Sequence, residues 1–235
     1  MIANAIVMAA GEGRRLRPLT DRWPKPALPI DGRPVIATLL QELAAAGVER
    51  ATVVVRHLAE QVERLVGGPG AFPLEVRFAR QEGPHGSADA VLAALSAGAA
   101  VPTLIAAADT VFVPGDVARV ARAFAESRAE GAIAVRRQPA PDPPHRYATR
   151  VEGGRVTRVF DDDPANPLSG APLWAIREPI VPLLGLDDRP HELGRAFQRA
   201  VDGGMTVLGI EVGRTRDLTG PEDLVVENFP YSRRL

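Results

Sequence analysis

Short apolar segments and amphipathic helical patterns alternate through the first 136 residues, and this alternation limits the folds that the chain can adopt. Buried strands are expected at 5–10, 51–55, 74–78, 103–107 and 132–136. Helices are expected at 34–46, 59–66, 87–97 and 116–128. Because a helix lies between each strand and the next, these strands cannot be joined by tight hairpins and should run parallel. The pattern predicts an α/β fold with a mixed, mostly parallel sheet flanked by helices.

The pattern changes after residue 136. Four prolines within 138–145 predict a loop. Two β-rich segments, 147–151 and 156–160, flank Gly153-Gly154 and predict a β-hairpin. Further strands are expected at 171–176 and 206–211, and helices at 192–201 and 221–227, the last with Thr219 as its N-cap. We find no internal repeat and no convincing linker, so the expectation is one domain over 1–235.

Composition excludes several classes of protein. The formal net charge is −1, so no overall field favours nucleic acid or an anionic membrane. The chain has no cysteine, which rules out disulfides and thiolate metal sites and leaves carboxylate and imidazole ligands. The N-terminus lacks a basic signal-peptide region, and no run of 18 apolar residues occurs. We therefore expect a cytoplasmic protein with no membrane span, whose oligomeric state the sequence leaves open.

A glycine loop follows the first expected strand. Gly11 and Gly13 can bring backbone N–H groups onto anionic oxygens. The loop is not a dinucleotide fingerprint, because Leu16 stands where the third glycine should be, and it lacks the Gly-Lys-Ser/Thr ending of a P-loop. Several cations follow: Arg14, Arg15, Arg17 and Lys25. Two glycines followed by this much positive charge suit a triphosphate.

Lys25 is the sole lysine among the 28 basic residues of the chain. Lysine carries a compact point charge, whereas arginine carries a wide planar fork. All other basic residues of the chain are arginine, so we expect Lys25 to occupy a position where the wide guanidinium group of arginine does not fit.

The segment 9–30 resembles the signature of the sugar-phosphate nucleotidylyltransferases, the nucleoside-diphosphate-sugar pyrophosphorylases. That signature reads Gly-x-Gly-x-Arg-Leu-x-Pro-Leu-Thr, then a short spacer and Pro-Lys-Pro. The resemblance implies a Rossmann-like (GT-A-like) fold. It also implies a Mg²⁺-dependent enzyme that transfers a nucleotidyl group from a nucleoside triphosphate to a sugar 1-phosphate and releases pyrophosphate. Residues 1–136 would form the nucleotide-binding half, and residues 137–235 would complete the acceptor and metal sites.

The resemblance also assigns roles to residues of the first half. The catalytic phosphate contacts would come from Arg15 and Lys25. The nucleotide would be bound by Ala9, Ala10, Gly11, Gly13, Gln81, Gly86 and Ser87. Glutamine can satisfy the imide edge of a pyrimidine, so Gln81 favours UTP or dTTP, and guanine and cytosine stay open.

Two aspartates are expected to hold Mg²⁺. Asp109 follows the buried run 104–108, and a carboxylate at the carboxyl end of a parallel strand lies where ligands bind in open α/β sheets. Hard oxygen ligands suit Mg²⁺. The family has Gly-Asp at this point, and this chain has Ala108-Asp109. By resemblance alone, Asp217 would be the second ligand.

The acceptor side departs from the family pattern. The family's Glu-Lys-Pro becomes Asp162-Asp163-Pro164, which keeps a carboxylate at Asp162 and reverses the charge of the phosphate-binding lysine at Asp163. Either an arginine, with Arg146 and Arg158 as candidates, replaces that lysine or the contact is absent. The remaining acceptor-binding residues implied by the resemblance are Tyr147 and Gly170.

Other interpretations stay open on these residues. The acceptor could be a non-sugar phosphate such as phosphocholine or inositol phosphate, and Asp163 would suit an acceptor that carries positive charge, as phosphocholine does. The altered acceptor motif would also fit a non-catalytic regulatory paralogue. A glycosyltransferase of the GT-A type could use 161–163 as its metal triad, although the cationic loop argues against it. No hexapeptide repeat follows Asp217, so we expect no β-helix domain and a single activity.

Overall fold

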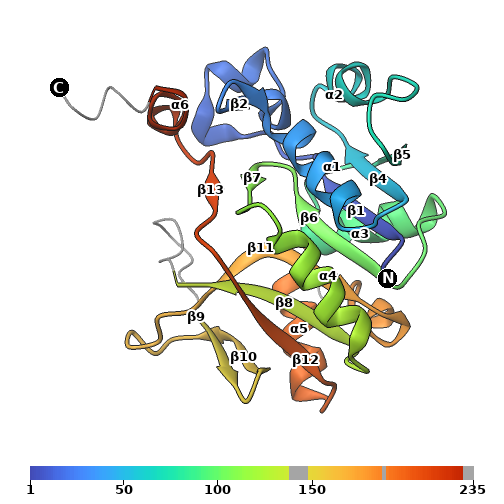
Figure 1. Ribbon diagram of the computed structural model, residues 1–235, viewed down its shortest axis with the longest axis vertical. Helices are drawn as coiled ribbons and strands as arrows, with labels where there is room; N and C mark the ends of the chain where they lie inside the picture. Colours follow the sequence, from blue (N-terminus) through green and yellow to red (C-terminus); the bar gives the residue numbers. More distant parts are fainter. Residues whose placement is uncertain (138–147, 187–188, 230–235) are drawn as a thin grey trace.

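The computed structural model describes residues 1–137, 148–186 and 189–229. Its centre is a nine-stranded sheet with helices on both faces (Figure 1). The strands of this sheet are β1 (Asn4–Met8), β4 (Arg50–Val55), β5 (Glu75–Arg80), β6 (Thr103–Ala107), β8 (Gly131–Arg136), β9 (Ala148–Glu152), β10 (Arg155–Asp161), β11 (Ser169–Ile176) and β12 (Val207–Val212). The bounds of each of these strands lie within two residues of an expected strand.

The order of the strands is β5-β4-β1-β6-β11-β8-β12-β10-β9. The strands β5, β4, β1 and β6 are parallel neighbours, and β12 is parallel to β8. Two strands, β11 and β10, are antiparallel to the others in this sheet. The predicted mixed α/β fold is therefore confirmed. β11, from the second half of the chain, lies between β6 and β8 of the first half, so the two halves are interleaved.

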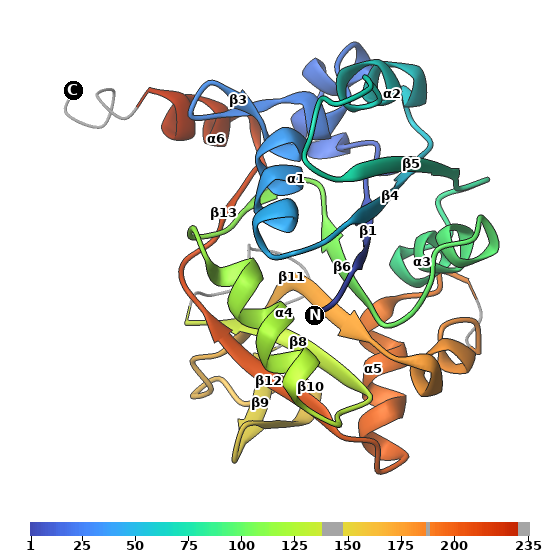
Figure 2. The same cartoon turned by 45° about the vertical axis from the view of Figure 1, so that its right-hand side comes forward.

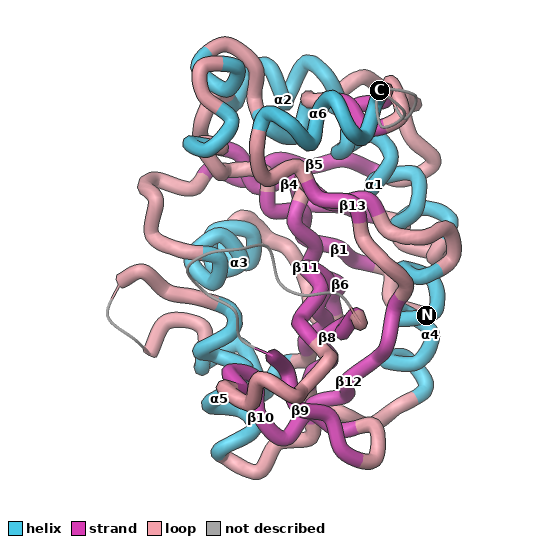
Figure 3. Tube along the Cα trace, turned by 90° about the vertical axis from the view of Figure 1, so that its left-hand side faces the viewer, coloured by secondary structure: helices cyan, strands magenta, loops and turns pink. Residues whose placement is uncertain are grey.

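The helices are α1 (Val35–Ala45), α2 (Ala59–Val66), α3 (Ser87–Ser96), α4 (Asp116–Glu126), α5 (Leu193–Asp202) and α6 (Pro221–Asn228). Figures 2 and 3 show α1 and α4 on one face of the sheet and α3 and α5 on the other. Along β1 the side chains alternate between these faces. Val7 joins the core beneath α1 and α4, which includes Phe124, while Ile6 joins the core beneath α3 and α5, which includes Phe197.

Two short ribbons lie outside the main sheet. One pairs β2 (Pro29–Ile30) with β3 (Arg33–Pro34), and the other pairs β7 (Thr110–Val111) with β13 (Arg216–Asp217). Single-turn 3₁₀ helices occupy Arg14–Leu16, Leu19–Asp21 and Lys25–Ala27, and a longer one occupies Glu178–Leu183. Among the residues that the structure describes, no helix has the length and apolar character needed to cross a lipid bilayer.

The expected hairpin is present. β9 and β10 pair in antiparallel fashion across a turn in which both Gly153 and Gly154 have positive φ, at 55° and 78°. Such a turn matches the right-handed twist of the strands and favours glycine. The proline-rich loop at 138–145 lies outside the described residues.

The expected N-cap of the last helix was wrong. Gly220, rather than Thr219, is the N-cap of α6. The carboxylate of Asp223, in the first turn, accepts hydrogen bonds from the backbone N–H groups of Thr219 (2.6 Å) and Gly220 (2.8 Å). A carboxylate at this position satisfies N–H groups at the start of the helix and interacts favourably with its dipole, so a hydroxyl cap is not needed.

Candidate active site

The glycine loop leaves the carboxyl end of β1, and its two glycines meet different surroundings. Gly13 has φ +63°, and a Cβ there would lie 2.9 Å from Cγ2 of Thr20 and 3.2 Å from Cβ of Lys25. A Cβ on Gly11 would meet nothing within 4 Å. The fold itself therefore requires glycine at position 13, whereas Gly11 leaves open space in which a ligand can approach the backbone.

A cavity of about 460 Å³ opens beside this loop. Its lining consists of Met8, Ala10, Gly11, Glu12, Gly13, Arg14, Arg56, Gln81, Pro84, Gly86, Ser87 and Ala90. The structure thus brings the glycine loop together with the segment at 81–87, as expected for a nucleotide site. Of the residues expected to bind nucleotide, Ala9 does not line the cavity; it is buried, and its N–H donates to the carbonyl of Val54.

The side-chain amide of Gln81 has a defined orientation. Its Nε2 donates to the carbonyl of Gly86 (3.0 Å) and to Oδ2 of Asp89 (2.9 Å). Because both partners are pure acceptors, the nitrogen must face them. Its Oε1 accepts no hydrogen bond from the described residues, so Gln81 can present an acceptor to a ligand in the cavity.

The turn at Gly86 is held by a segment of the second half of the chain. The N–H of His191 donates to the carbonyl of His85 (2.7 Å), and the N–H of Ala88 donates to the carbonyl of His191 (2.8 Å). The hydroxyl of Ser87 donates to the carboxylate of Glu192 and accepts from the N–H of Leu193 (2.9 Å). The Ser87 side chain is thus engaged within the protein. No pattern in the sequence indicates that 189–193 lies beside this turn.

The pairing of β7 with β13 brings Asp109 and Asp217 together, although 108 positions separate them in the sequence. Asp217 is the register partner of Thr110, and the N–H of Leu218 donates to the carbonyl of Asp109 (3.3 Å). The hydroxyl of Thr110 lies 2.6 Å from Oδ1 of Asp217 and 3.3 Å from Oδ1 of Asp109. The two aspartates expected to bind metal therefore form one cluster at the carboxyl edge of the sheet.

Each of these carboxylates forms an ion pair with a basic side chain of the protein. Nζ of Lys25 pairs with Oδ2 of Asp109. Nη1 of Arg136 lies 2.6 Å from Oδ2 of Asp217, and the Arg136 side chain is 4% exposed. Arg136 was not among the expected site residues. The available signal was its place as the last residue of a buried strand, at the edge of the sheet where Asp109 also lies.

The donor set fits Mg²⁺. In phosphate-transfer sites Mg²⁺ takes one or two protein carboxylates and completes its shell with water and substrate phosphate oxygens. Asp109 and Asp217 supply two carboxylates, and no cluster of three acidic or histidine side chains forms within the described ranges. Lys25 and Arg136 balance the two negative charges of this pair.

The two expected catalytic cations differ in their surroundings. Lys25 packs its side chain against the Gly13 backbone and so connects the cavity with the Asp109–Asp217 cluster. Arg15 is exposed in the first 3₁₀ turn after the loop and forms no ion pair with any described residue. Its guanidinium is free to meet an anionic ligand.

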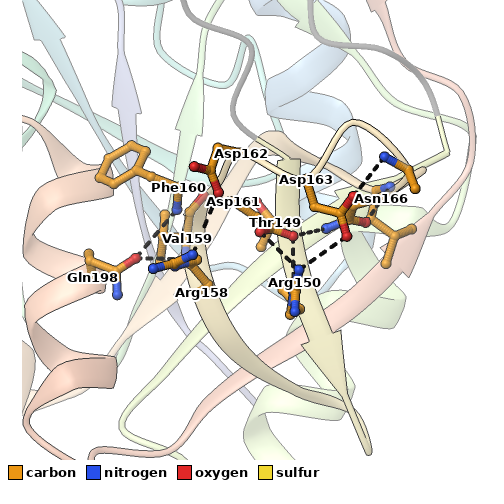
Figure 4. A network of polar contacts seen from close by, with 12 residues as sticks. Thr149, Arg150, Arg158, Val159, Phe160, Asp161, Asp162, Asp163, Asn166 and Gln198 are labelled. Carbon is orange, nitrogen blue, oxygen red and sulfur yellow. Dashed lines mark hydrogen bonds and ion pairs between the residues drawn. The ribbon is translucent and has the colours of Figure 1, made fainter.

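The acidic stretch 161–163 is paired with arginines (Figure 4). Asp161 is buried, and Arg150 donates to both of its oxygens, at 3.0 and 3.2 Å. Burial raises the pKa of Asp161, but hydrogen bonds from Arg150 and Asn166 outweigh this effect and hold the pKa below its usual range. Arg150 also lies 3.2 Å from Oδ2 of Asp163. The charge at Asp163 is therefore partly neutralised by the protein itself.

The rest of the acceptor side is more open. Asp162 is exposed and lies 3.6 Å from Arg158, which is itself more than half exposed. Arg158 is thus a surface ion-pair partner of Asp162. Gly170 lies in β11, beside Val135 of β8. Tyr147 and Arg146 lie outside the described residues.

Comparison with known proteins decides the family. The family model described as Nucleotidyl transferase matches residues 4–167, which is more than half of the chain. The chain belongs to the nucleotidyl transferase family. The glycine loop, the Gln81 turn, Asp109 and the hairpin with its acidic stretch all lie within the matched range, whereas Asp217 lies beyond it.

Individual nucleotidyl transferases differ in the substrates that their names state. The chain is 53% identical over 58 residues to 2-aminoethylphosphonate cytidylyltransferase of Lancefieldella rimae, covering 25% of this chain and 24% of the relative. It is 26% identical over 96% of its length to glucose-1-phosphate thymidylyltransferase of Streptomyces antibioticus, covering 65% of that protein. The chain thus spans less than two thirds of either relative.

A solved structure shares the fold. The inositol-1-phosphate CTP transferase from T. maritima superposes with a TM-score of 0.78 at 22% identity, covering 94% of this chain and 91% of that one. Nucleotidyl transfer is therefore common to all three relatives, while both the base and the acceptor vary among them.

Proposed function

We propose that this protein transfers a nucleotidyl group from a nucleoside triphosphate to a sugar 1-phosphate and releases pyrophosphate. The observation that carries the proposal is the convergence of Lys25, Asp109 and Asp217 beside a cavity lined by the glycine loop. Lys25 contacts both the glycine loop and the carboxylate pair, because its side chain packs on Gly13 and its ammonium pairs with Asp109. A nucleotide in the cavity would thus place its phosphates next to the carboxylate pair.

The reaction needs no protein nucleophile. An oxygen of the acceptor phosphate, already an anion, forms a bond to the α-phosphorus, and the bond from that phosphorus to the leaving pyrophosphate breaks. Catalysis then consists of positioning and charge stabilisation. Lys25 would stabilise the charge at the α-phosphate, and Arg15 the charge on the pyrophosphate. Asp109 and Asp217 would hold Mg²⁺, which when bound neutralises phosphate oxygens.

The base preference is proposed from Gln81. Its free Oε1 can accept one hydrogen bond from a base N–H, and the imide N–H of uracil or thymine supplies that donor. We therefore propose UTP or dTTP as the preferred nucleotide substrate. Cytosine and guanine also carry N–H donors, so CTP and GTP belong in the same test.

A second candidate function differs in its acceptor, a phosphate or phosphonate that carries a cationic group. Two observations favour it: the exposed carboxylate of Asp162 beside Asp163, and the similarity to a protein named 2-aminoethylphosphonate cytidylyltransferase. The pairing of Asp163 with Arg150 reduces the negative charge available to such a group. We therefore propose a sugar 1-phosphate as the preferred acceptor.

The test is pyrophosphate release with Mg²⁺, crossing UTP, dTTP, CTP, GTP and ATP with sugar 1-phosphates, inositol phosphate, phosphocholine and 2-aminoethylphosphonate. Asp109→Asn serves as the inactive control. Release with UTP or dTTP and a sugar 1-phosphate supports the first proposal, and release only with a cationic acceptor supports the second. Nucleotide binding without release for any pair would contradict both and favour a regulatory role.

A further inference from the structure

One carboxylate lines the cavity that the proposed function assigns to the nucleotide. Glu12 stands between Gly11 and Gly13, and its carboxylate meets several arginines. Oε2 lies 2.8 Å from Nε of Arg14 and 3.9 Å from Nη2 of Arg17, and Oε1 lies 3.2 Å from Nη1 of Arg56. Arg14 and Arg56 also line the cavity. The Glu12 carboxylate therefore occupies arginine N–H donors beside the glycine loop, although the expected ligand of this loop is itself an anion.

Glu12 is charged under all ordinary conditions. Hydrogen bonds from Arg14 and Arg56 lower the pKa of Glu12 to about 2. Its side chain is about one fifth exposed, so its charge acts on whatever enters the cavity. Because like charges repel, a triphosphate that approaches these arginines must compete with the Glu12 carboxylate.

Arg56 is the second part of the arrangement. It follows β4 and directs its guanidinium to the cavity, and its side chain is 20% exposed. Its Nε is buried and has no hydrogen-bond partner among the described residues. The next residue, His57, is fixed by a 2.8 Å hydrogen bond between its Nε2 and the carbonyl of Thr20, so the backbone here is tied to the end of the glycine-loop region. Arg56 thus has donor capacity that Glu12 does not use.

We propose that Glu12 is an internal stand-in for substrate phosphate. In the free protein its carboxylate occupies Arg14 and Arg56, and phosphate oxygens of the nucleotide replace it, which makes Arg56 a nucleotide-binding residue. The inference rests on the proposed function, since it takes the cavity as the nucleotide site. The exchange lowers the affinity for the triphosphate and for the pyrophosphate product alike, and so favours product release.

The test measures binding in the absence of an acceptor, so that no turnover occurs. Dissociation constants for UTP and for inorganic pyrophosphate are obtained by calorimetry for the wild type and for Glu12→Gln, which removes the charge and keeps the shape. We expect Glu12→Gln to bind both about tenfold more tightly. The matched control is Glu75→Gln, because Glu75 also pairs with an arginine, Arg77 at 2.8 Å, but does not line the cavity. The control should bind as the wild type does.

A second variant tests the role of Arg56 and serves if the first is poorly folded. Arg56→Met should weaken UTP binding about tenfold, because a charge-assisted hydrogen bond to phosphate is lost. In an Arg56→Met background, Glu12→Gln should gain less than it does alone, since the two residues act on the same contact. Thermal unfolding of each variant verifies the fold.

Several outcomes would overturn the inference: unchanged or weaker binding by Glu12→Gln, a gain of equal size in Glu75→Gln, or wild-type binding by Arg56→Met. Failure of the proposed function looks different. If the variants change binding as expected but no acceptor yields pyrophosphate, the stand-in role holds and the transferase proposal fails. If transfer occurs and the variants bind as the wild type does, the stand-in role fails by itself.

Discussion

Replacement of Gly86 by alanine tests how the second half of the chain supports the cavity beside the glycine loop. Gly86 has φ +102° and ψ 174°, a region that is nearly exclusive to glycine. A Cβ there would lie 2.2 Å from the carbonyl oxygen of His191, 2.7 Å from its carbonyl carbon and 2.8 Å from its nitrogen. All three are backbone atoms, so a side-chain rotation cannot relieve the clash.

The magnitude follows from two contributions. The backbone conformation costs a non-glycine residue about 2 kcal/mol. Moving His191 away breaks its hydrogen bonds with His85 (2.7 Å) and Ala88 (2.8 Å), each worth about 1 kcal/mol. We therefore expect Gly86→Ala to lower the free energy of unfolding by about 4 kcal/mol, or the melting temperature by roughly 10 °C in a domain of this size. The affinity for UTP should also fall, because the Gly86 carbonyl orients Gln81.

The control is Gly98→Ala, at the other end of the same helix. Gly98 also has a positive φ, +93°, but a Cβ there meets nothing within 4 Å. It should cost only the backbone strain, about 1–2 kcal/mol. Urea denaturation measures both variants, with the midpoint interpreted at constant m-value. If Gly86→Ala and Gly98→Ala agree within about 0.5 kcal/mol, the clash with His191 does not exist and the reasoning is refuted.

Three further predictions concern charged groups. Lys25→Ala should lower the rate of pyrophosphate release about 10²–10³-fold. Lys25→Arg should also lower this rate, because the planar guanidinium is wider than an ammonium group. Near-wild-type rates for Lys25→Arg would contradict this prediction. Asp109→Asn and Asp217→Asn should each weaken Mg²⁺ binding measured by calorimetry without substrate, and an unchanged affinity would remove that residue from the metal site. Arg150→Met should lower the urea midpoint at pH 7, because it leaves the buried Asp161 carboxylate unpaired. Since the folded-state pKa of Asp161 is lowered, the stability from this pair is present above the unfolded pKa of about 3.9 and is lost as the pH falls below it, so the difference from wild type should shrink below pH 4.

Features that depend on neighbouring residues could be predicted from the sequence. The apolar runs gave the strands, since side chains of period two or 3.6 encode which faces are buried. The Gly11–Gly13 loop and Lys25 also lie within one short segment, and the family resemblance followed from it. Asp109 could be placed at the carboxyl edge of the sheet because it comes directly after a buried strand.

The family resemblance implied the pairing of Asp109 with Asp217, but only the tertiary structure showed how it forms and revealed the other partners of these residues. The insertion of β11 between β6 and β8 and the pairing of β7 with β13 decide that Asp217 lies beside Asp109 and that Arg136 neutralises it. In the same way, His191 meets Gly86 and Arg56 meets Glu12. The physical reason is that a local pattern fixes which face of a strand is buried, whereas strand order and register depend on the packing of the whole sheet.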